Sequence, residues 1–222
     1  MRKGITREQV INKALELMKD REDIKGVNLR VVARELGCAH TNLYNYFTSF
    51  DELLSEAYIR VLQIFSEMLK KRISALEDYQ LMLKAFFSEI ISFYMDNKGW
   101  FRLLWVEIIG GKHKEVDYIA ASKTVDEYVT IMENILIHLY TTAPSPEQIK
   151  SILHIVHCYI YGEITLYIAN HSFIQENTEI LKREKLIPII EKSPLIPIED
   201  AFKRYVNDEA IRLFYLYLGR KE

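Results

Sequence analysis

Apolar residues recur every three to four positions along most of the chain, which is the period of an α-helix. The clearest short example is the stretch 29–36, where four apolar residues fall on one helix face: Leu29, Val32, Ala33 and Leu36. Asn28 precedes this stretch and can cap the free N–H groups of a first turn. Gly37 follows it, where a left-handed residue commonly ends a helix. The pattern predicts a short helix from Leu29 to Gly37.

A second short helix is predicted to start about three residues after Gly37, because Leu43 and Phe47 are four apart and share a face. Two short helices around a three- to four-residue turn form a helix-turn-helix, whose second helix can enter the major groove. The remaining face of this second helix carries side chains that can hydrogen-bond to bases or phosphates: His40, Thr41, Asn42, Tyr44, Asn45 and Tyr46.

Capping patterns place the helices on either side of this motif. Thr6 and Gln9 have capping-box spacing, which predicts that a first helix starts at Thr6. Ser49 and Glu52 repeat that spacing at the start of a long helix that meets no glycine or proline until about Ala75. We therefore predict a three-helix head domain over residues 1–50, a second domain over residues 51–222, and a connecting helix over residues 51–75.

The second domain shows only helical patterns, so the predicted fold class is all-α. Expected helices are Tyr79 to Asn97, Trp100 to Ile109, Glu115 to Tyr140, Glu147 to about Asn170, Glu176 to Lys185, and Ile198 to Leu218. An irregular crossing with Pro188, Pro194 and Pro197 is expected before the last of them. The helix after Pro146 is apolar over most of its circumference, so it must be buried on several sides. One side can face a second subunit, and Ile160 and Phe214 are the expected interface positions.

Three runs of sequence resemble the DNA-binding region of TetR-type transcriptional regulators: R-V-V-A-R-E-L-G, then L-Y-N-Y-F, then D-E-L-L. The resemblance covers roughly residues 5 to 58. One departure is Ala39, where the family often has a serine that caps the recognition helix. Alanine cannot accept that hydrogen bond, a loss of roughly 0.5–2 kcal/mol unless His40 or Thr41 replaces it.

The resemblance implies an N-terminal helix-turn-helix domain followed by a helical domain that binds a ligand and forms a homodimer. It implies that Arg30 holds a phosphate, that four side chains meet base edges, and that Tyr44 and Tyr46 reach phosphates. The four base-reading candidates are His40, Thr41, Asn42 and Asn45. The expected partners are double-stranded operator DNA, a small-molecule effector and a second copy of the chain. The expected function is a repressor that a small lipophilic ligand releases from a palindromic operator.

Charge and cysteine content agree with this interpretation. The formal net charge is only -2, yet residues 1–50 hold nine Lys/Arg against six Asp/Glu, while the remainder holds 20 against 25. A basic head on an acidic body suits docking on phosphates, and ordinary scatter of surface charge is the alternative. Two cysteines do not suggest a disulfide framework, and neither a signal peptide nor an apolar run of about 18 residues is found. We therefore expect a cytoplasmic protein without a membrane span.

No motif predicts an enzyme, because the chain has neither a glycine-rich phosphate loop nor a recognisable nucleophile with its base. No cofactor is expected. His154 and His157 are three apart and share a helix face, as two metal ligands can. Further ligands cannot be identified, and such a pair more often serves as hydrogen-bonded core or pocket residues, so no metal site is predicted.

Aromatic side chains crowd the helices of the second domain, and His157 and three acids interrupt the same apolar runs: Glu89, Glu107 and Glu163. A buried carboxylate is costly without a partner, which can be a Lys or Arg, another subunit or a ligand. The predicted ligand-binding residues are Trp100, Trp105, Glu107, His157, Tyr161 and Glu163. The aromatic faces favour an apolar, aromatic or cationic ligand. If each Glu pairs within the fold, a neutral or acidic ligand is the alternative.

Two other functions fit the same residues. A ligand-responsive activator would have the same architecture as a repressor, and sequence does not separate them. The alternative from another functional class is a helical carrier or enzyme that keeps a degenerate DNA-binding head. A gel-retardation experiment with the protein's own promoter DNA distinguishes the two, because only a regulator should prefer that sequence.

Overall fold

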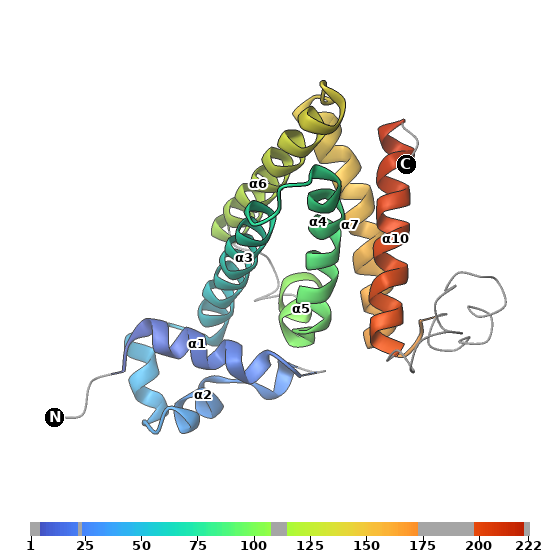
Figure 1. Ribbon diagram of the computed structural model, residues 1–222. Coiled ribbons are helices and arrows are strands. Elements are labelled where there is room, and N and C mark those ends of the chain that lie inside the picture. Colours follow the sequence, from blue (N-terminus) through green and yellow to red (C-terminus); the bar gives the residue numbers. More distant parts are fainter. Residues whose placement is uncertain (1–4, 22–23, 108–114, 173–197, 220–222) are drawn as a thin grey trace. The chain divides into compact units, whose positions relative to one another are not determined.

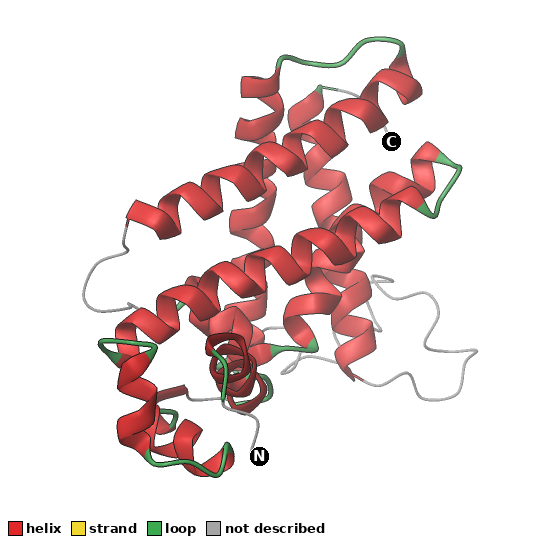
Figure 2. Ribbon diagram, turned by 90° about the vertical axis from the view of Figure 1, so that its left-hand side faces the viewer, coloured by secondary structure: helices red, strands yellow, loops and turns green. Residues whose placement is uncertain are grey.

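The computed structural model describes residues 5–21, 24–107, 115–172 and 198–219. Every regular element within these residues is helical, joined by loops, so the predicted all-α class is confirmed (Figures 1 and 2). The chain forms two compact units. Unit 1 comprises Met1–Glu67 and Asp96–Thr124, and unit 2 comprises Met68–Met95 and Val125–Glu222. Unit 1 is larger than the predicted head of residues 1–50, whose functional boundary stays a prediction. None of the described helices is long and apolar enough to cross a membrane.

Unit 1 begins with helix α1 (Arg7–Met18), which is capped as the sequence predicts. The Thr6 hydroxyl accepts a hydrogen bond from the Gln9 N–H, and the Gln9 side chain accepts one from the Thr6 N–H. This capping box satisfies two N–H groups that have no partner within the helix. The buried face of α1 then follows the helical period through Val10, Ala14, Leu15 and Met18.

Helix α2 (Leu29–Glu35) follows a short 3-10 turn, η1 (Ile24–Gly26). The Asn28 side chain accepts hydrogen bonds from the N–H groups of Arg30 and Val31, so the predicted cap is confirmed. After α2 the chain turns at Gly37, whose φ of 68° is left-handed. The predicted glycine turn is therefore also confirmed.

The second helix of the helix-turn-helix is a 3-10 helix, η2 (His40–Asn45), where an α-helix was predicted. Its first residues receive no side-chain hydrogen bond, as the alanine at position 39 implies, and neither His40 nor Thr41 replaces the missing cap. A short uncapped segment is easily wound as 3-10 turns, in which each N–H bonds to the carbonyl three residues earlier. Leu43 and Phe47 still share one face and are 0% and 1% exposed.

Helices α3 (Phe50–Ser74) and α6 (Glu115–Tyr140) contribute residues to both units. Half of the capping box predicted from Ser49 and Glu52 is present at the start of α3: the Glu52 N–H donates to the Ser49 hydroxyl at 3.1 Å. The Glu52 carboxylate accepts from the Thr48 N–H, at 2.7 Å. In unit 1 the buried Ser55 hydroxyl donates to the buried Asp117 carboxylate, which joins α3 to the first turn of α6.

The short helix α5 (Lys98–Trp105) belongs to unit 1 and is docked on the C-terminal end of α1. The Gly99 N–H donates to the Lys19 carbonyl at 2.9 Å, and the Trp100 indole N–H donates to the Leu15 carbonyl at 2.8 Å. The predicted helix from Trp100 to Ile109 thus starts two residues earlier and ends at Trp105. Its last two predicted residues lie outside the described ones.

Unit 2 is built on three helices that contact one another: α4 (Tyr79–Met95), α7 (Pro146–Ile168) and α10 (Ile198–Leu218) (Figure 1). Pro146 occupies the first turn of α7, as predicted, after a capping box of Ser145 and Gln148. The predicted bounds of α6 and α10 are confirmed. The predicted helix from Glu176 to Lys185 and the proline-containing crossing lie outside the described residues.

Ile160 and Phe214 lie in the core of unit 2 and not on its surface. Both are 0% exposed within a single chain, and the Phe214 ring packs 5.5 Å from the ring of Phe87 in α4. Their predicted role as interface positions is therefore wrong. The apolar circumference of α7 is explained largely by its contacts with α4 and α10 of the same chain.

Candidate nucleic-acid interface and ligand-binding residues

One face of η2 is buried and the other presents polar side chains to solvent. Leu43 is fully buried, whereas the predicted base-reading residues are all exposed: His40, Thr41, Asn42 and Asn45. Tyr44 is 54% exposed, and its ring lies edge-on to that of His40 at 6.4 Å. Arg30 is exposed in the first turn of α2, where Asn28 holds its backbone N–H. These side chains are free to contact DNA, and their individual roles stay predictions.

Tyr46 is less exposed than Tyr44 and Asn45, and its hydroxyl proton already forms a hydrogen bond. Its hydroxyl donates to the Ile5 carbonyl, and its own carbonyl accepts from the Arg7 guanidinium. A phosphate oxygen accepts hydrogen bonds but has none to donate. The predicted phosphate contact of Tyr46 therefore requires its bond to Ile5 to break.

Arg7 holds the end of η2 to α1 and α3. Its guanidinium donates to the carboxylates of Glu52 and Glu56, with N–O distances of 2.9 Å for Nη2–Glu52 and Nε–Glu56. Its Cζ also lies 4.4 Å above the ring of Phe47. Hydrogen bonds from Thr48, and then from Arg7, lower the pKa of Glu52 to about 2. Sequence reasoning missed Arg7 because its partners lie 39 to 49 residues away, so no local pattern marks it.

The six predicted ligand-binding residues are divided between the two units. Trp100, Trp105 and Glu107 belong to unit 1, and His157, Tyr161 and Glu163 belong to unit 2. The Trp100 indole serves the docking of α5 on α1, whereas Trp105 is 43% exposed. Glu89 forms an ion pair with Arg72 at 3.0 Å within unit 2, so its charge is compensated within the fold. A ligand-binding role for the six residues stays a prediction.

The aromatic cluster of unit 2 surrounds His157 on α7. Its ring stacks on Tyr161 at 5.5 Å and meets the edge of Tyr128 at 5.8 Å, and Tyr94 packs against Tyr161 at 5.9 Å. The His157 Nε2 atom is buried and has no hydrogen-bond partner among the described residues. Burial, and then repulsion from His154, lowers the pKa of His157 to about 4, so the imidazole is neutral at pH 7. A neutral ring nitrogen in an aromatic setting can bind a ligand's polar group.

Among the described residues, no third side chain joins His154 and His157 in a group that could hold a metal ion. No group of three or more His, Cys, Asp or Glu side chains with suitable placement occurs among residues 5–21, 24–107, 115–172 and 198–219. His154 is exposed, and its Nε2 lies 3.7 Å from the sulfur of Cys158.

Protonation of His157 should destabilise the fold at acid pH. The unfolded imidazole titrates near 6.5 and the folded one near 4, so the unfolded state binds more protons between these values. Stability is then lost as pH falls from about 6.5 to about 4, by about 3 kcal/mol in total. We expect the His157→Phe variant to lose less unfolding free energy than wild type over this range, in urea titrations at pH 7, 5.5 and 4.5. Equal losses in the two proteins would contradict the buried neutral imidazole.

A stripe of partly exposed side chains runs along α7 at helical spacing: Ile155, Tyr159, Glu163 and Leu166. Ile155 and Leu166 are 37% and 45% exposed, and burial raises the pKa of Glu163. Burial, and the nearby charges of Glu163, Tyr205 and Glu209, raise the pKa of Tyr159, so α10 borders the same surface. Leu216 of α10 is 61% exposed. We call these residues of α7, with Tyr205, Glu209 and Leu216 of α10, the α7–α10 stripe.

Comparison with known proteins gives matches only at the level of structure. No family model and no curated protein sequence matches the chain. A protein of unknown function from Rhodococcus sp. RHA1 superimposes with a TM-score of 0.66 at 15% identity, covering 96% of this chain and 95% of that chain.

Two similar structures are of transcription regulators. A protein assigned to the TetR family from Shewanella sp. PV-4 gives a TM-score of 0.55 at 13% identity, covering 96% of this chain and 97% of that one. The regulator FadR from Bacillus subtilis, solved with stearoyl-CoA, gives a TM-score of 0.52 at 13% identity, covering 98% of this chain and 100% of that chain. At these identities the likeness establishes the fold. The chain therefore has the all-helical fold of TetR-type transcription regulators, as the resemblance of its N-terminal residues predicts.

Proposed function

We propose that this protein is a DNA-binding transcription regulator that acts as a homodimer and is released from its operator by a small molecule. The observation that carries the proposal is the exposed polar face of η2, set opposite the buried Leu43 and after the left-handed turn at Gly37. A short helix with one anchored face and one polar face can present its side chains to the major groove. The similar structures of transcription regulators support it.

The proposed interface divides positioning from sequence reading. Arg30 and Tyr44 contact phosphates, which orient the head on the duplex but carry no sequence information. Asn42 and Asn45 read base edges, since an amide can bond adenine through both its oxygen and its nitrogen. His40 and Thr41 complete the reading face.

Retardation of the protein's own promoter DNA in a gel tests the function. The expected result is a retarded complex that excess unlabelled promoter removes and excess unrelated DNA of equal length does not. A helical carrier or enzyme with a degenerate head would show no preference between these competitors, and that result would refute DNA regulation. Transcription from the same promoter in vitro then separates repression from activation.

Asn42→Ala and Asn45→Ala are each expected to weaken promoter binding by about 1–3 kcal/mol and leave non-specific binding almost unchanged. Tyr44→Phe should weaken both kinds of binding more equally, because it removes a phosphate contact. Asn134→Ala, an exposed asparagine on α6, is the matched control and should change neither. Binding isotherms by fluorescence anisotropy on promoter and scrambled DNA measure all four. If both asparagine variants of η2 keep the wild-type preference for promoter DNA, the base-reading roles are wrong.

The α7–α10 stripe supports the homodimer, because it leaves apolar side chains of unit 2 uncovered. Leu216, Leu166 and Ile155 are each more than a third exposed, at 61%, 45% and 37%. A two-fold symmetric contact uses the same surface on both subunits. A dimer places two heads at one spacing, which a palindromic operator requires.

The aromatic cluster around His157 supports a ligand site in unit 2. Pockets for small molecules are mostly apolar with a few placed polar groups, and the unpartnered His157 Nε2 is such a group. The tyrosine faces and Glu163 favour an apolar, aromatic or cationic ligand. A ligand that prefers a different spacing of the two heads would lower the affinity for DNA.

Titration of matched lipophilic compounds tests the ligand class. A cation, a neutral compound and an acid of similar size are added in parallel, and release of promoter DNA is followed. We expect release by the cation or the neutral compound, weakened by His157→Phe and unchanged by His154→Phe, whose ring is exposed. Release by acids alone would reject the cationic ligand, and release by none of the three would reject ligand control by this class of compound.

A further inference from the structure

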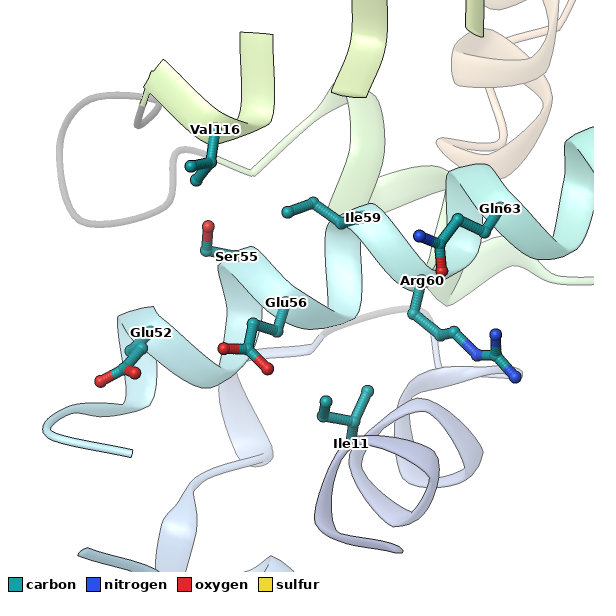
Figure 3. A pocket seen from close by; sticks show the side chains of 8 residues that line it. All are labelled: Ile11, Glu52, Ser55, Glu56, Ile59, Arg60, Gln63 and Val116. Carbon is teal, nitrogen blue, oxygen red and sulfur yellow. The ribbon is translucent and has the colours of Figure 1, made fainter. Parts of the chain in front are cut away.

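A pocket of 440 Å³ lies within unit 1, on the side of α3 between α1 and the first turn of α6 (Figure 3). Its size is in the range of small-molecule sites. Figure 3 shows Ser55 and Ile59 directed toward Val116, while Glu56 and Arg60 lie on the side of α3 that faces Ile11. The lining residues are Ile11, Glu52, Ser55, Glu56, Ile59, Arg60, Gln63 and Val116.

The polar groups of this pocket differ in whether their hydrogen-bonding capacity is already used. Both oxygens of Glu56 accept from Arg7, and Glu52 accepts from Arg7 and Thr48. The Ser55 hydroxyl donates to Asp117. Arg60 has no ion pair among the described residues, and its Nε atom is buried without an acceptor. Gln63 adds an exposed, neutral amide. The charged group of the lining whose hydrogen-bonding capacity is still unused is therefore the Arg60 guanidinium, a donor.

We propose that this pocket binds a small organic monoanion, with its carboxylate on Arg60 and its apolar body against Ile11, Ile59 and Val116. A guanidinium binds a carboxylate through two parallel N–H donors, so turning its Nε edge into the pocket would satisfy that atom. The carboxylate of Glu56, one helical turn away, disfavours ligands with two or more negative charges. Arg7 already occupies the position beside Glu52 and Glu56 that a cationic ligand would need.

The pocket is linked to the recognition element by a short chain of contacts. Glu56 holds Arg7, and Arg7 donates to the Tyr46 carbonyl at the end of η2. A ligand between Arg60 and Ile11 lies beside this link, so its binding shifts the position of η2 and changes the affinity for DNA. This consequence, unlike the binding itself, rests on the proposed function.

Calorimetric titration of the full-length protein with benzoate, benzamide and benzylamine, without DNA, tests the site. These probes share one ring and differ in charge. We expect benzoate to bind at least tenfold more tightly than the other two, and Arg60→Met to lose at least tenfold in benzoate affinity. Arg204→Met, an exposed arginine on α10, is the matched control and should retain it. Val116→Trp, at a position 52% exposed, should fill the pocket and abolish benzoate binding. This second variant tests the site even if Arg60→Met fails to fold.

Three results would overturn the site: no benzoate binding, tighter binding of benzylamine, or unchanged benzoate affinity in both pocket variants. Anisotropy on promoter DNA with and without benzoate then tests the link to η2. Calorimetric binding by a protein that never retards promoter DNA would refute the proposed function and support the pocket. Promoter binding by a protein that ignores benzoate would refute the pocket and support the function.

Discussion

The Gly99→Ala variant is expected to lose about 2–4 kcal/mol of unfolding free energy. A Cβ atom at this position would lie 1.7 Å from the backbone oxygen of Met18 and 2.7 Å from its carbonyl carbon. Both are backbone atoms of the α1 terminus, so no side-chain rotation can relieve the clash. Forced overpacking costs about 1–3 kcal/mol, and the loss of the Gly99–Lys19 hydrogen bond adds about 1 kcal/mol.

Urea unfolding followed by tryptophan fluorescence measures this loss and reports on the contact itself. Trp100 follows Gly99, and its indole N–H donates to the Leu15 carbonyl of α1. Undocking of α5 would expose this indole to water, so the emission should move toward longer wavelengths. Gly26→Ala is the matched control, because its added Cβ would meet only the end of the Arg21 side chain, at 2.9 Å. That flexible group can move, so little change is expected. Wild-type stability and emission in Gly99→Ala would show that α5 does not dock closely on α1.

The Leu216→Glu variant is expected to be a monomer that no longer binds promoter DNA. Leu216 is 61% exposed within one chain, so glutamate there is tolerated by the fold. In a symmetric dimer the substitution occurs twice in one interface. If each copy costs about 2 kcal/mol, as central apolar residues do, dimer affinity falls by roughly a factor of 1,000. Loss of the second head then removes half of the contacts with a palindromic site.

Sedimentation velocity at micromolar concentration, together with anisotropy on promoter DNA, measures both effects. Leu81→Glu is the matched control: it replaces a leucine on α4 that is 53% exposed and lies outside the α7–α10 stripe. It should remain a dimer. Ile160→Glu should instead unfold unit 2, since that side chain is fully buried. A wild-type protein that sediments as a monomer, or a Leu216→Glu protein that sediments as a dimer, would exclude the stripe as the dimer interface.

The sequence determined those features that depend on residues three or four apart. The Thr6 capping box, the Asn28 cap and the turn at Gly37 were all predictable, because each uses groups within one helical turn. The exposed face of η2 followed in the same way, since Leu43 and Phe47 mark its buried side. For the same reason the bounds of α6 and α10 could be read from apolar periodicity and helix-breaking residues.

Only the tertiary structure decided which helix faces are covered and which distant groups meet. Ile160 and Phe214 looked like interface residues, because periodicity does not distinguish contact with another helix of the chain from contact with another subunit. Arg7 meets Glu56 across 49 residues, and Trp100 meets Leu15 across 85, and no local pattern encodes such pairs. The division of the six predicted ligand residues between two units has the same cause. Helix formation is a local property of the chain, whereas burial and pairing depend on how the helices pack.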